Sequence, residues 1–280
     1  MPQPRSAGDA GSTSLGDFDL GRQIGSGAFG KVCEATSKRD LPYGAKGAVF
    51  AIKIYHADVL TREDRMRLER EYRTGLTLRH PNLVRFHDLV IDGEHSFLVM
   101  DLCDGQNLIR WRQSNPDPSG DFVLQFVTQM LEVLEFLHSS GRIHRDIKPT
   151  NINVDSEGRV RLLDYGLVLD LRDETRTTPN GDRCLGTLQY AAPETIFEKA
   201  YDHKYSPKSD LYSLGATLYY LLYGVQIFDS FKTTSDLIEA KRQHNISFSR
   251  RFEELGYPFH SGDPYSLWPA FGSIGITFDH

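Results

Sequence analysis

The spacing of apolar, β-branched and polar residues divides the chain into a strand-rich first part and a mainly helical second part. Residues 18–24 (FDLGRQI) and 31–36 (KVCEAT) flank a glycine-rich turn, and residues 48–55 (AVFAIKIY) form a β-branched and aromatic run. Such runs predict strands, and residues 37–47 (SKRDLPYGAKG) between them predict a hairpin loop. Two more strands are expected near LVRFHDLV and SFLVM.

Helical spacing marks three longer segments. Residues 61–78 are charged and predict a helix with Thr61 as N-cap, although Gly75 weakens its last turn by about 1 kcal/mol relative to alanine. Residues 209–223 predict a helix that is apolar on most sides and therefore central to its part of the fold. Asp121 is the expected N-cap of a further helix, whose apolar residues recur every three or four positions at Phe126, Met130, Val133, Leu134 and Leu137.

Composition and charge argue against several classes of protein. The 280 residues are 39% hydrophobic and 25% charged, as in an ordinary globular protein. A formal net charge of −6 disfavours a nucleic-acid partner, which would favour a basic surplus. The three cysteines are scattered without metal-ligand spacing, which indicates reduced thiols. With neither a signal peptide nor an apolar run of about 18 residues, we expect a cytoplasmic protein that has no membrane partner.

Two motifs in the first part suit the phosphates of a nucleotide. Lys53 lies on a predicted strand, from which it would point a cation at phosphates, and Glu71 is its candidate partner, with Glu69 as the local competitor. In the alternative interpretation, Lys53 reaches solvent and the glycines form a plain turn. A dinucleotide-binding fold is disfavoured because a strand, not a helix, follows the turn. Glycines let backbone N–H groups approach phosphate oxygens, and the run reads Gly25-Ser26-Gly27-Ala28-Phe29-Gly30-Lys31-Val32.

Three motifs in the second part complete the set. The irregular segment 144–151 contains Asp146, Lys148 and Asn151. A carboxylate can accept a hydroxyl proton, an ammonium can neutralise a phosphoryl group, and an amide oxygen can ligate a divalent ion. Asp164, a further hard oxygen ligand, ends a predicted hairpin over residues 152–164 and begins Asp164-Tyr165-Gly166. The last motif runs from Gly186 to Glu194 and is followed by Ser209-Asp210-Leu211-Tyr212-Ser213-Leu214-Gly215.

Taken in order, these motifs resemble the signature set of eukaryotic-type (Hanks-type) serine/threonine protein kinase domains. The resemblance runs from about Phe18 to Gly224. It implies an α+β fold of two lobes with ATP between them and a protein as substrate. The strand-rich N-lobe with one helix would span about residues 17–100, the hinge 101–103, and the mainly helical C-lobe 104–224. A flexible tail over 1–16 and a divergent segment over 225–280 would flank these parts of a kinase domain at 17–280.

The resemblance also assigns catalytic and metal-binding roles. Asp146 would be the catalytic base, Lys148 would contact the γ-phosphate, and Asn151 and Asp164 would ligate Mg²⁺, with Mn²⁺ as an alternative ion. Serine/threonine specificity is implied by Lys148, two residues after Asp146, and by Thr187, which is expected to bond with both. Arg145 would make the activation loop controllable by phosphorylation, and the candidate acceptors, which also fit an ordinary polar loop, are Thr175, Thr177 and Thr178.

On the nucleotide side, the resemblance pairs Lys53 with Glu71 and places Lys53 on the α- and β-phosphates. Val32 and Ala51 would pack on adenine, Met100 would be the gatekeeper, and the backbone of the hinge would bind the base. The expected ATP-binding residues are Ile24, Gly25, Ser26, Gly27, Ala28, Phe29, Gly30, Lys31, Val32, Ala51, Lys53, Met100, Asp101, Cys103 and Asn153.

Three features depart from the family pattern. Asn153 stands where the family has an apolar residue beneath adenine, which predicts weakened nucleotide packing because a buried amide needs partners. Gly75 replaces an apolar residue that stacks on the aromatic of the Asp-aromatic-Gly motif, here Tyr165, and so predicts a gap and a loosely held helix. The aromatic-rich segment 225–280 lacks helical periodicity and an identifiable arginine partner for Glu194; it is either a diverged part of the large lobe or a contact for another chain or domain.

Three functions therefore compete. The intact Lys53, Asp146, Asn151 and Asp164 favour an active serine/threonine protein kinase. The departures leave open a pseudokinase that binds nucleotide and acts as a scaffold. A small-molecule kinase of related fold is disfavoured because such enzymes typically lack the stretch from Gly186 to Glu194.

Overall fold

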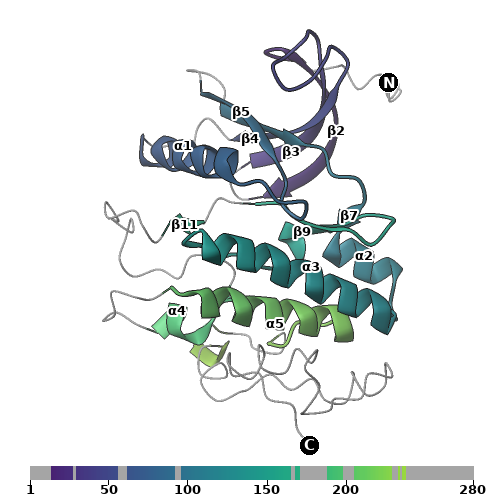
Figure 1. Cartoon of the computed structure of the whole chain (residues 1–280), viewed down its shortest axis with the longest axis vertical. Coiled ribbons are helices and arrows are strands. Elements are labelled where there is room, and N and C mark those ends of the chain that lie inside the picture. Colours follow the sequence, from purple (N-terminus) through teal and green to yellow (C-terminus); the bar gives the residue numbers. More distant parts are fainter. Residues whose placement is uncertain are drawn as a thin grey trace, which may run out of the picture. The chain divides into compact units, whose positions relative to one another are not determined.

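The chain divides into two compact units, residues 1–77 with 85–102, and residues 78–84 with 103–280. None of the described helices has the length and apolar character that crossing a membrane requires. The computed structural model (Figure 1) describes residues 14–27, 30–55, 62–91, 96–164, 168–170, 188–197, 205–228, 233 and 235–237.

The first unit is built on a six-stranded antiparallel sheet in the order β1-β2-β3-β4-β6-β5. Alternate residues of β4 and β6 share one face of this sheet, where Phe50, Ile52, Phe97 and Val99 form a core with Phe18. Phe18 meets the rings of Phe50 and Phe97 edge-on at 6.1 and 6.3 Å between centroids. The predicted strands are confirmed, with bounds Phe18–Gly27 (β2), Gly30–Ser37 (β3), Val49–Tyr55 (β4), Phe86–Ile91 (β5) and Ser96–Asp101 (β6). The expected flexible tail over 1–16 is wrong at its end, because Ser14–Leu15 (β1) pairs with β2 and buries Leu15.

The helix of this unit, α1 (Arg62–Thr77), packs against β5 (Figure 1). At Gly75 the approach is close, because a Cβ added there would lie 2.3 Å from Cδ2 of Phe86, a side chain that is only 1% exposed. The Phe86 ring therefore fills the space beside Gly75, whereas Tyr165, against which the gap was expected, lies outside the described residues. A hydrogen bond also connects α1 to β5, since the Tyr72 hydroxyl donates to the His87 carbonyl at 3.2 Å. The expected N-cap, Thr61, lies outside the described residues.

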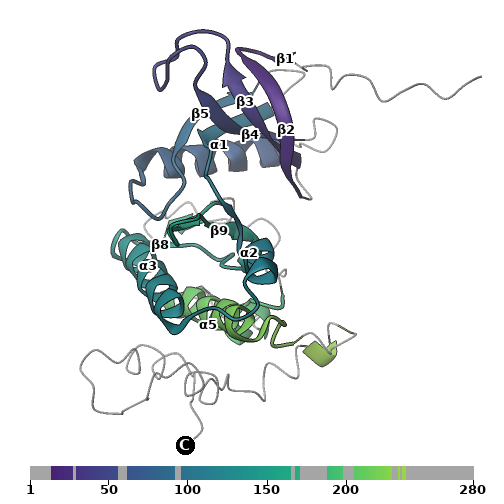
Figure 2. The same ribbon diagram turned by 90° about the vertical axis from the view of Figure 1, so that its right-hand side faces the viewer.

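In the second unit, α3 (Gly120–Ser139) and α5 (Pro207–Tyr223) run side by side (Figure 2). Along the chain, α2 (Leu108–Ser114) precedes α3, and the short α4 (Pro193–Phe197) precedes α5. The expected N-cap of α3 is wrong: Ser119 caps it by accepting from the Phe122 N–H at 3.3 Å. Asp121 instead lies in the first turn, where a negative carboxylate interacts favourably with the positive end of the helix dipole. The predicted apolar face is confirmed by the burial of Phe126, Met130, Val133, Leu134 and Leu137.

Both ends of α5 have identifiable caps. At its start, Ser206 and Ser209 form a reciprocal capping box, which begins the helix two residues before the predicted position. At its end, Gly224 adopts a left-handed φ of 74°, and the buried Arg112 donates from Nε to the Leu221 carbonyl at 2.6 Å. A cation on these last carbonyls stabilises the C-terminus of the helix.

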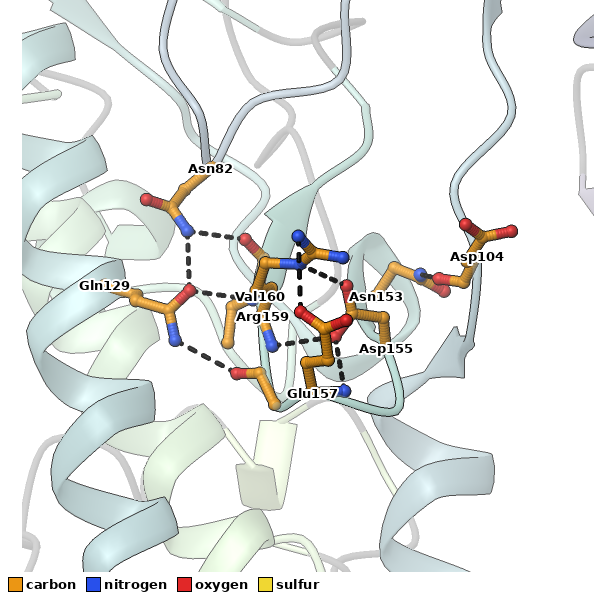
Figure 3. A network of polar contacts seen from close by, with 9 residues as sticks. Asn82, Asp104, Gln129, Asn153, Asp155, Glu157, Arg159 and Val160 are labelled. Carbon is orange, nitrogen blue, oxygen red and sulfur yellow. Dashed lines mark hydrogen bonds and ion pairs between the residues drawn. The ribbon is translucent and has the colours of Figure 1, made fainter.

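The predicted hairpin is confirmed as β9 (Ile152–Val154) and β10 (Val160–Leu162), which pair antiparallel and are joined by β7 (Gln106–Asn107) in the order β10-β9-β7. A polar network surrounds it (Figure 3). Gln129 of α3 accepts from Asn82 Nδ2 at 2.7 Å and from the Val160 N–H at 2.9 Å, so the 78–84 turn, the hairpin and α3 are linked. A separate two-stranded pair joins β8 (Arg142–Ile143) to β11 (Leu169–Asp170).

Candidate active site

The segment that carries the expected catalytic base is anchored by one buried carboxylate. Asp210 of α5 is 0% exposed and accepts from the backbone N–H groups of His144 and Arg145, both at 2.8 Å. His138 Nε2 lies 2.8 Å from the same carboxylate. Arg145 has a left-handed φ of 68°, a conformation that costs a non-glycine residue about 1–2 kcal/mol. The bonds to Asp210 offset that cost and fix the direction in which the chain enters the loop.

Three of the predicted catalytic and metal-binding residues meet within this loop. The Asp146 carboxylate lies 2.7 Å from Lys148 Nζ and accepts from Asn151 Nδ2 at 2.9 Å. The same amide donates to the Asp146 carbonyl at 2.9 Å, which closes the loop at the 3₁₀ turn Pro149–Asn151. Charge-assisted contacts of this length are strong, so the carboxylate, the ammonium and the amide hold fixed relative positions.

His144, at the start of this loop, is a supporting group. Burial lowers the pKa of its imidazole, although the Asp210, Asp146 and Asp164 carboxylates oppose the change. Its Nδ1 accepts from the Asp146 N–H at 3.3 Å, a role that requires a ring without a proton on that nitrogen. A neutral imidazole that orients the Asp146 backbone follows from both observations.

Asn151 and Asp164 offer oxygen ligands of the type that suits a divalent ion. The Leu163 N–H donates to the Asn151 carbonyl at 2.9 Å, which ties the chain just before Asp164 to the loop. Because the Asn151 amide nitrogen faces Asp146, its oxygen is the atom suited to a metal. Among the described residues, no three His, Cys, Asp or Glu side chains gather into a site. The donor set fits Mg²⁺, which typically takes one or two protein side chains together with substrate phosphates.

The expected phosphate-binding lysine lies in the first unit. Lys53 stands on β4 opposite Val32 of β3 and Leu98 of β6, and its Nζ is 5.5 Å from the centroid of the Tyr55 ring. Glu71 of α1 is buried, at 8% exposed, whereas the competing Glu69 is exposed. A buried carboxylate requires a cation or hydrogen-bond donors, so burial favours Glu71 as the partner of Lys53.

The glycine-rich run forms the β2–β3 hairpin, in which Gly27 pairs with Gly30. Gly30 has a φ of 154°, and a Cβ there would lie 1.9 Å from the Ile54 carbonyl oxygen, so the close approach of β4 requires glycine. Ala51 faces Met100 across β4 and β6, and both are buried. The remaining expected nucleotide residues of this sheet lie on β2 and β3 as Ile24, Gly25, Ser26, Lys31 and Val32.

The expected hinge begins at the end of β6. Asp101 is the last residue of that strand, and Cys103 is the first residue of the chain's return to the second unit. Asn153 lies on β9, is 7% exposed, and donates its amide to the Asp104 carbonyl just beyond the hinge (Figure 3). The buried amide thus has the partner that its burial demands.

Several sequence-predicted residues lie outside the described part of the chain, and one anchoring residue was not predicted. The sequence alone assigned no role to Asp210. The signal that could have found it is a charged residue within a helix that is apolar on most sides. The family pattern gives Glu194 an arginine partner that the sequence did not identify; within the described residues, Ser209 Oγ donates to Glu194 Oε1 at 3.2 Å. The residues outside the described ranges are Ala28, Phe29, Tyr165, Gly166, Thr175, Thr177, Thr178 and Thr187.

Comparison with known proteins gives matches along most of the chain. CBL-interacting protein kinase 4 of Oryza sativa subsp. japonica is 34% identical over 224 residues, which cover 78% of this chain and 47% of that protein. The 3-phosphoinositide-dependent protein kinase 1 of Arabidopsis thaliana is 30% identical over 251 residues, covering 85% and 48%. A cAMP-dependent protein kinase, catalytic subunit-like protein of Caenorhabditis elegans is 28% identical over 242 residues, covering 86% and 56%. The chain spans about half the length of the curated relatives it matches.

The family comparison agrees with the order of motifs and with the folds of the two units. Residues 18–262 match the family described as protein kinase domain. Members of this family use ATP and divalent metal ions and act on protein substrates. The strand-rich unit with one helix and the mainly helical unit are the two lobes of the predicted α+β fold. The chain belongs to the eukaryotic-type protein kinase domain family.

Proposed function

We propose that this chain is a serine/threonine protein kinase that transfers the γ-phosphate of Mg-ATP to serine or threonine hydroxyls of proteins. The observation that carries the proposal is the Asp146 carboxylate, held 2.7 Å from Lys148 Nζ and 2.9 Å from Asn151 Nδ2 on a loop anchored by Asp210. A scaffold has no need for a loop in which a base, a cation and a ligand oxygen are fixed together.

In the proposed reaction, Asp146 orients the substrate hydroxyl and accepts its proton as the oxygen attacks the γ-phosphorus. A positioned general base contributes about 10²–10⁴ in rate. Lys148, beside that carboxylate, faces the negative charge of the transferred group and stabilises it. The bond to the β-phosphate oxygen breaks as the new P–O bond forms, in line with the attacking hydroxyl.

The nucleotide side of the proposal assigns Lys53 to the α- and β-phosphates, with Glu71 holding the lysine. The glycine-rich hairpin covers the phosphates, while Val32 and Ala51 contact the adenine. Asn151 and Asp164 hold Mg²⁺, or Mn²⁺ in its place, and the ion neutralises phosphate charge when bound. Asn153 contributes to the floor beneath the base, where its amide reduces apolar contact.

Serine/threonine specificity, regulation and surroundings are part of the same proposal. The proposal assigns to Thr187 the contacts with Asp146 and Lys148 that the resemblance implies, and it assigns regulation to phosphorylation at Thr175, Thr177 or Thr178 acting through Arg145. Arabidopsis thaliana CBL-interacting serine/threonine-protein kinase 16, 33% identical over 222 residues, carries that specificity in its name. We place the protein in the cytoplasm, with a partner chain or domain contacting residues 225–280.

The test is transfer of labelled γ-phosphate from Mg-ATP to a generic protein substrate and to the chain itself, followed by phosphoamino-acid analysis. We expect label on serine and threonine, and a loss of at least about 10²-fold in rate for Asp146→Asn. A wild-type chain that binds Mg-ATP but transfers no label would support the scaffold interpretation instead. Label on a small molecule but on no protein would support the interpretation as a small-molecule kinase.

A further inference from the structure

A bulge in the sheet of the first unit directs one histidine toward the expected hinge. Phe86 pairs with Met100 and Asp88 pairs with Val99, so His87 is the extra residue where the β5–β6 register shifts. Bulges of this type re-aim side chains and interrupt the backbone ladder. The His87 carbonyl accepts from the Tyr72 hydroxyl of α1, and the side chain points to the end of β6.

The His87 ring is fixed by aromatic neighbours. It stacks on Tyr43 with centroids 5.0 Å apart and planes 17° apart, and it meets Phe50 edge-on at 5.4 Å. Its side chain is 5% exposed. Tyr43 comes from the 37–47 loop, whose Leu41 and Gly44 form an isolated bridge. The loop, which the sequence predicted only as a hairpin connection, therefore supplies one wall of a site for the histidine.

From this site His87 reaches Asp101, the first residue of the expected hinge. Nε2 lies 2.6 Å from Asp101 Oδ1, a carboxylate whose side chain is 50% exposed. The Asp101 N–H also donates to the Arg85 carbonyl at 3.0 Å, and Asp101 pairs with Phe50 of β4. Backbone and side chain are thus held together at the point where the chain leaves the sheet.

We propose that His87 is a positioning residue for the nucleotide: by holding Asp101 it fixes the hinge backbone that binds adenine, and Tyr43 holds His87. The inference rests on the proposed function, because it deepens the role of the same nucleotide site. A ring that is stacked on Tyr43 and meets Phe50 edge-on cannot follow a moving carboxylate, so Asp101 adopts the position that the ring allows. Loss of the contact loosens the hinge and weakens binding of the base, without touching the groups that transfer the phosphate.

The experiment is isothermal titration of adenosine and of Mg-ATP into the wild-type chain and His87→Phe. Phenylalanine keeps the ring packing and removes the contact to Asp101. We expect both dissociation constants to rise by about five- to tenfold, the loss typical of one intramolecular hydrogen bond. The turnover number at saturating ATP stays within about twofold of wild type, since the proposed transferring groups are untouched.

Two further variants separate positioning from general destabilisation. Tyr43→Phe removes only the hydroxyl that lies 3.3 Å from Asp88 Oδ2 and keeps the stacked ring, so its adenosine affinity matches wild type. In the double variant His87→Phe/Asp101→Ala, the loss of affinity should equal the larger of the two single-variant losses, because both changes remove the same contact between His87 and Asp101.

The inference is overturned if His87→Phe binds adenosine with wild-type affinity, or if the losses in the double variant are additive. Either result counts against it even if the variant unfolds at a lower temperature than wild type. The proposed function fails separately, when the wild-type chain binds adenosine and Mg-ATP but transfers no phosphate.

Discussion

The polar loop around Asp146 in the second unit and the sheet that carries Lys53 in the first are held in place by different forces. In the loop, Asp146, Lys148 and Asn151 contact one another within six residues, and the buried Asp210 fixes their backbone. In the first unit, Lys53 and Glu71 stand on separate elements, β4 and α1. Their positions depend on how closely α1 packs on β5.

This difference predicts different modes of failure. A polar loop loses its geometry when replacement of its buried anchor leaves N–H groups without acceptors, whatever the volume of the new side chain. A packed helix and sheet instead respond to the volume of the side chains between them. Variants that change charge and variants that change volume therefore distinguish the two regions.

The largest effect is expected for Asp210→Ala. The change leaves the His144 and Arg145 N–H groups and the His138 ring without their buried acceptor, and each donor left unpaired costs about 1–3 kcal/mol. Denaturant unfolding measures the loss, and phosphotransfer falls with it. The matched control is the exposed Asp236→Ala, which should stay within about 0.5 kcal/mol of wild type. Equal stability of the two variants would contradict the anchoring role.

A volume change in the first unit comes next. Gly75→Leu drives a side chain into the Phe86 ring, and overpacking of this kind costs about 1–3 kcal/mol. Because α1 carries Glu71, we also expect weaker Mg-ATP binding. Phe86→Leu supplies the space, so the double variant should be more stable than Gly75→Leu alone. If Gly75→Leu unfolds at the same denaturant concentration as wild type, the close packing of α1 on β5 does not determine its stability.

A smaller effect is expected at Asn153. Asn153→Leu removes the hydrogen bond to the Asp104 carbonyl, at a cost of about 1 kcal/mol in stability. In the proposed nucleotide site the leucine would also supply an apolar floor beneath adenine, for which we expect about three- to fivefold tighter ATP binding. Calorimetric titration with Mg-ATP measures the second effect. An unchanged dissociation constant would show that Asn153 does not contact the base.

The smallest effect concerns the β9–β10 turn. Burial alone would raise the pKa of Asp155, but hydrogen bonds from the Arg159 side chain and from the backbone N–H groups of Arg159 and Glu157 hold it below its ordinary value. A carboxyl with a lowered pKa stabilises the fold above its unfolded-state pKa of about 3.9 and loses that contribution as pH falls through the folded value.

Asp155→Asn tests this contribution through its pH dependence. The stability difference between wild type and Asp155→Asn should therefore shrink between about pH 5 and pH 2. Urea unfolding at several pH values in this range measures it. A difference that is constant across the range would mean that the Asp155 charge plays no part.

Motifs and periodicity predicted most of the fold, because strand and helix patterns depend on local sequence, and they placed Asp146, Lys148 and Asn151 on one loop. Strand runs, the 152–164 hairpin and the apolar face of α3 follow from spacing alone. Long-range complementarity was not visible: nothing in the sequence showed that Phe86 fills the space beside Gly75. The anchoring role of Asp210 depends on a contact across 66 residues to His144, and propensity carries no information about such distances.

The most direct test of the account measures Mg-ATP binding and phosphotransfer in one variant, Asp146→Asn. Because the polar loop is proposed to carry the chemistry and the sheet to carry the nucleotide, we expect a dissociation constant within about threefold of wild type and a transfer rate lowered by at least about 10²-fold. A variant that retains wild-type transfer, or that loses nucleotide binding together with transfer, would contradict this division of roles.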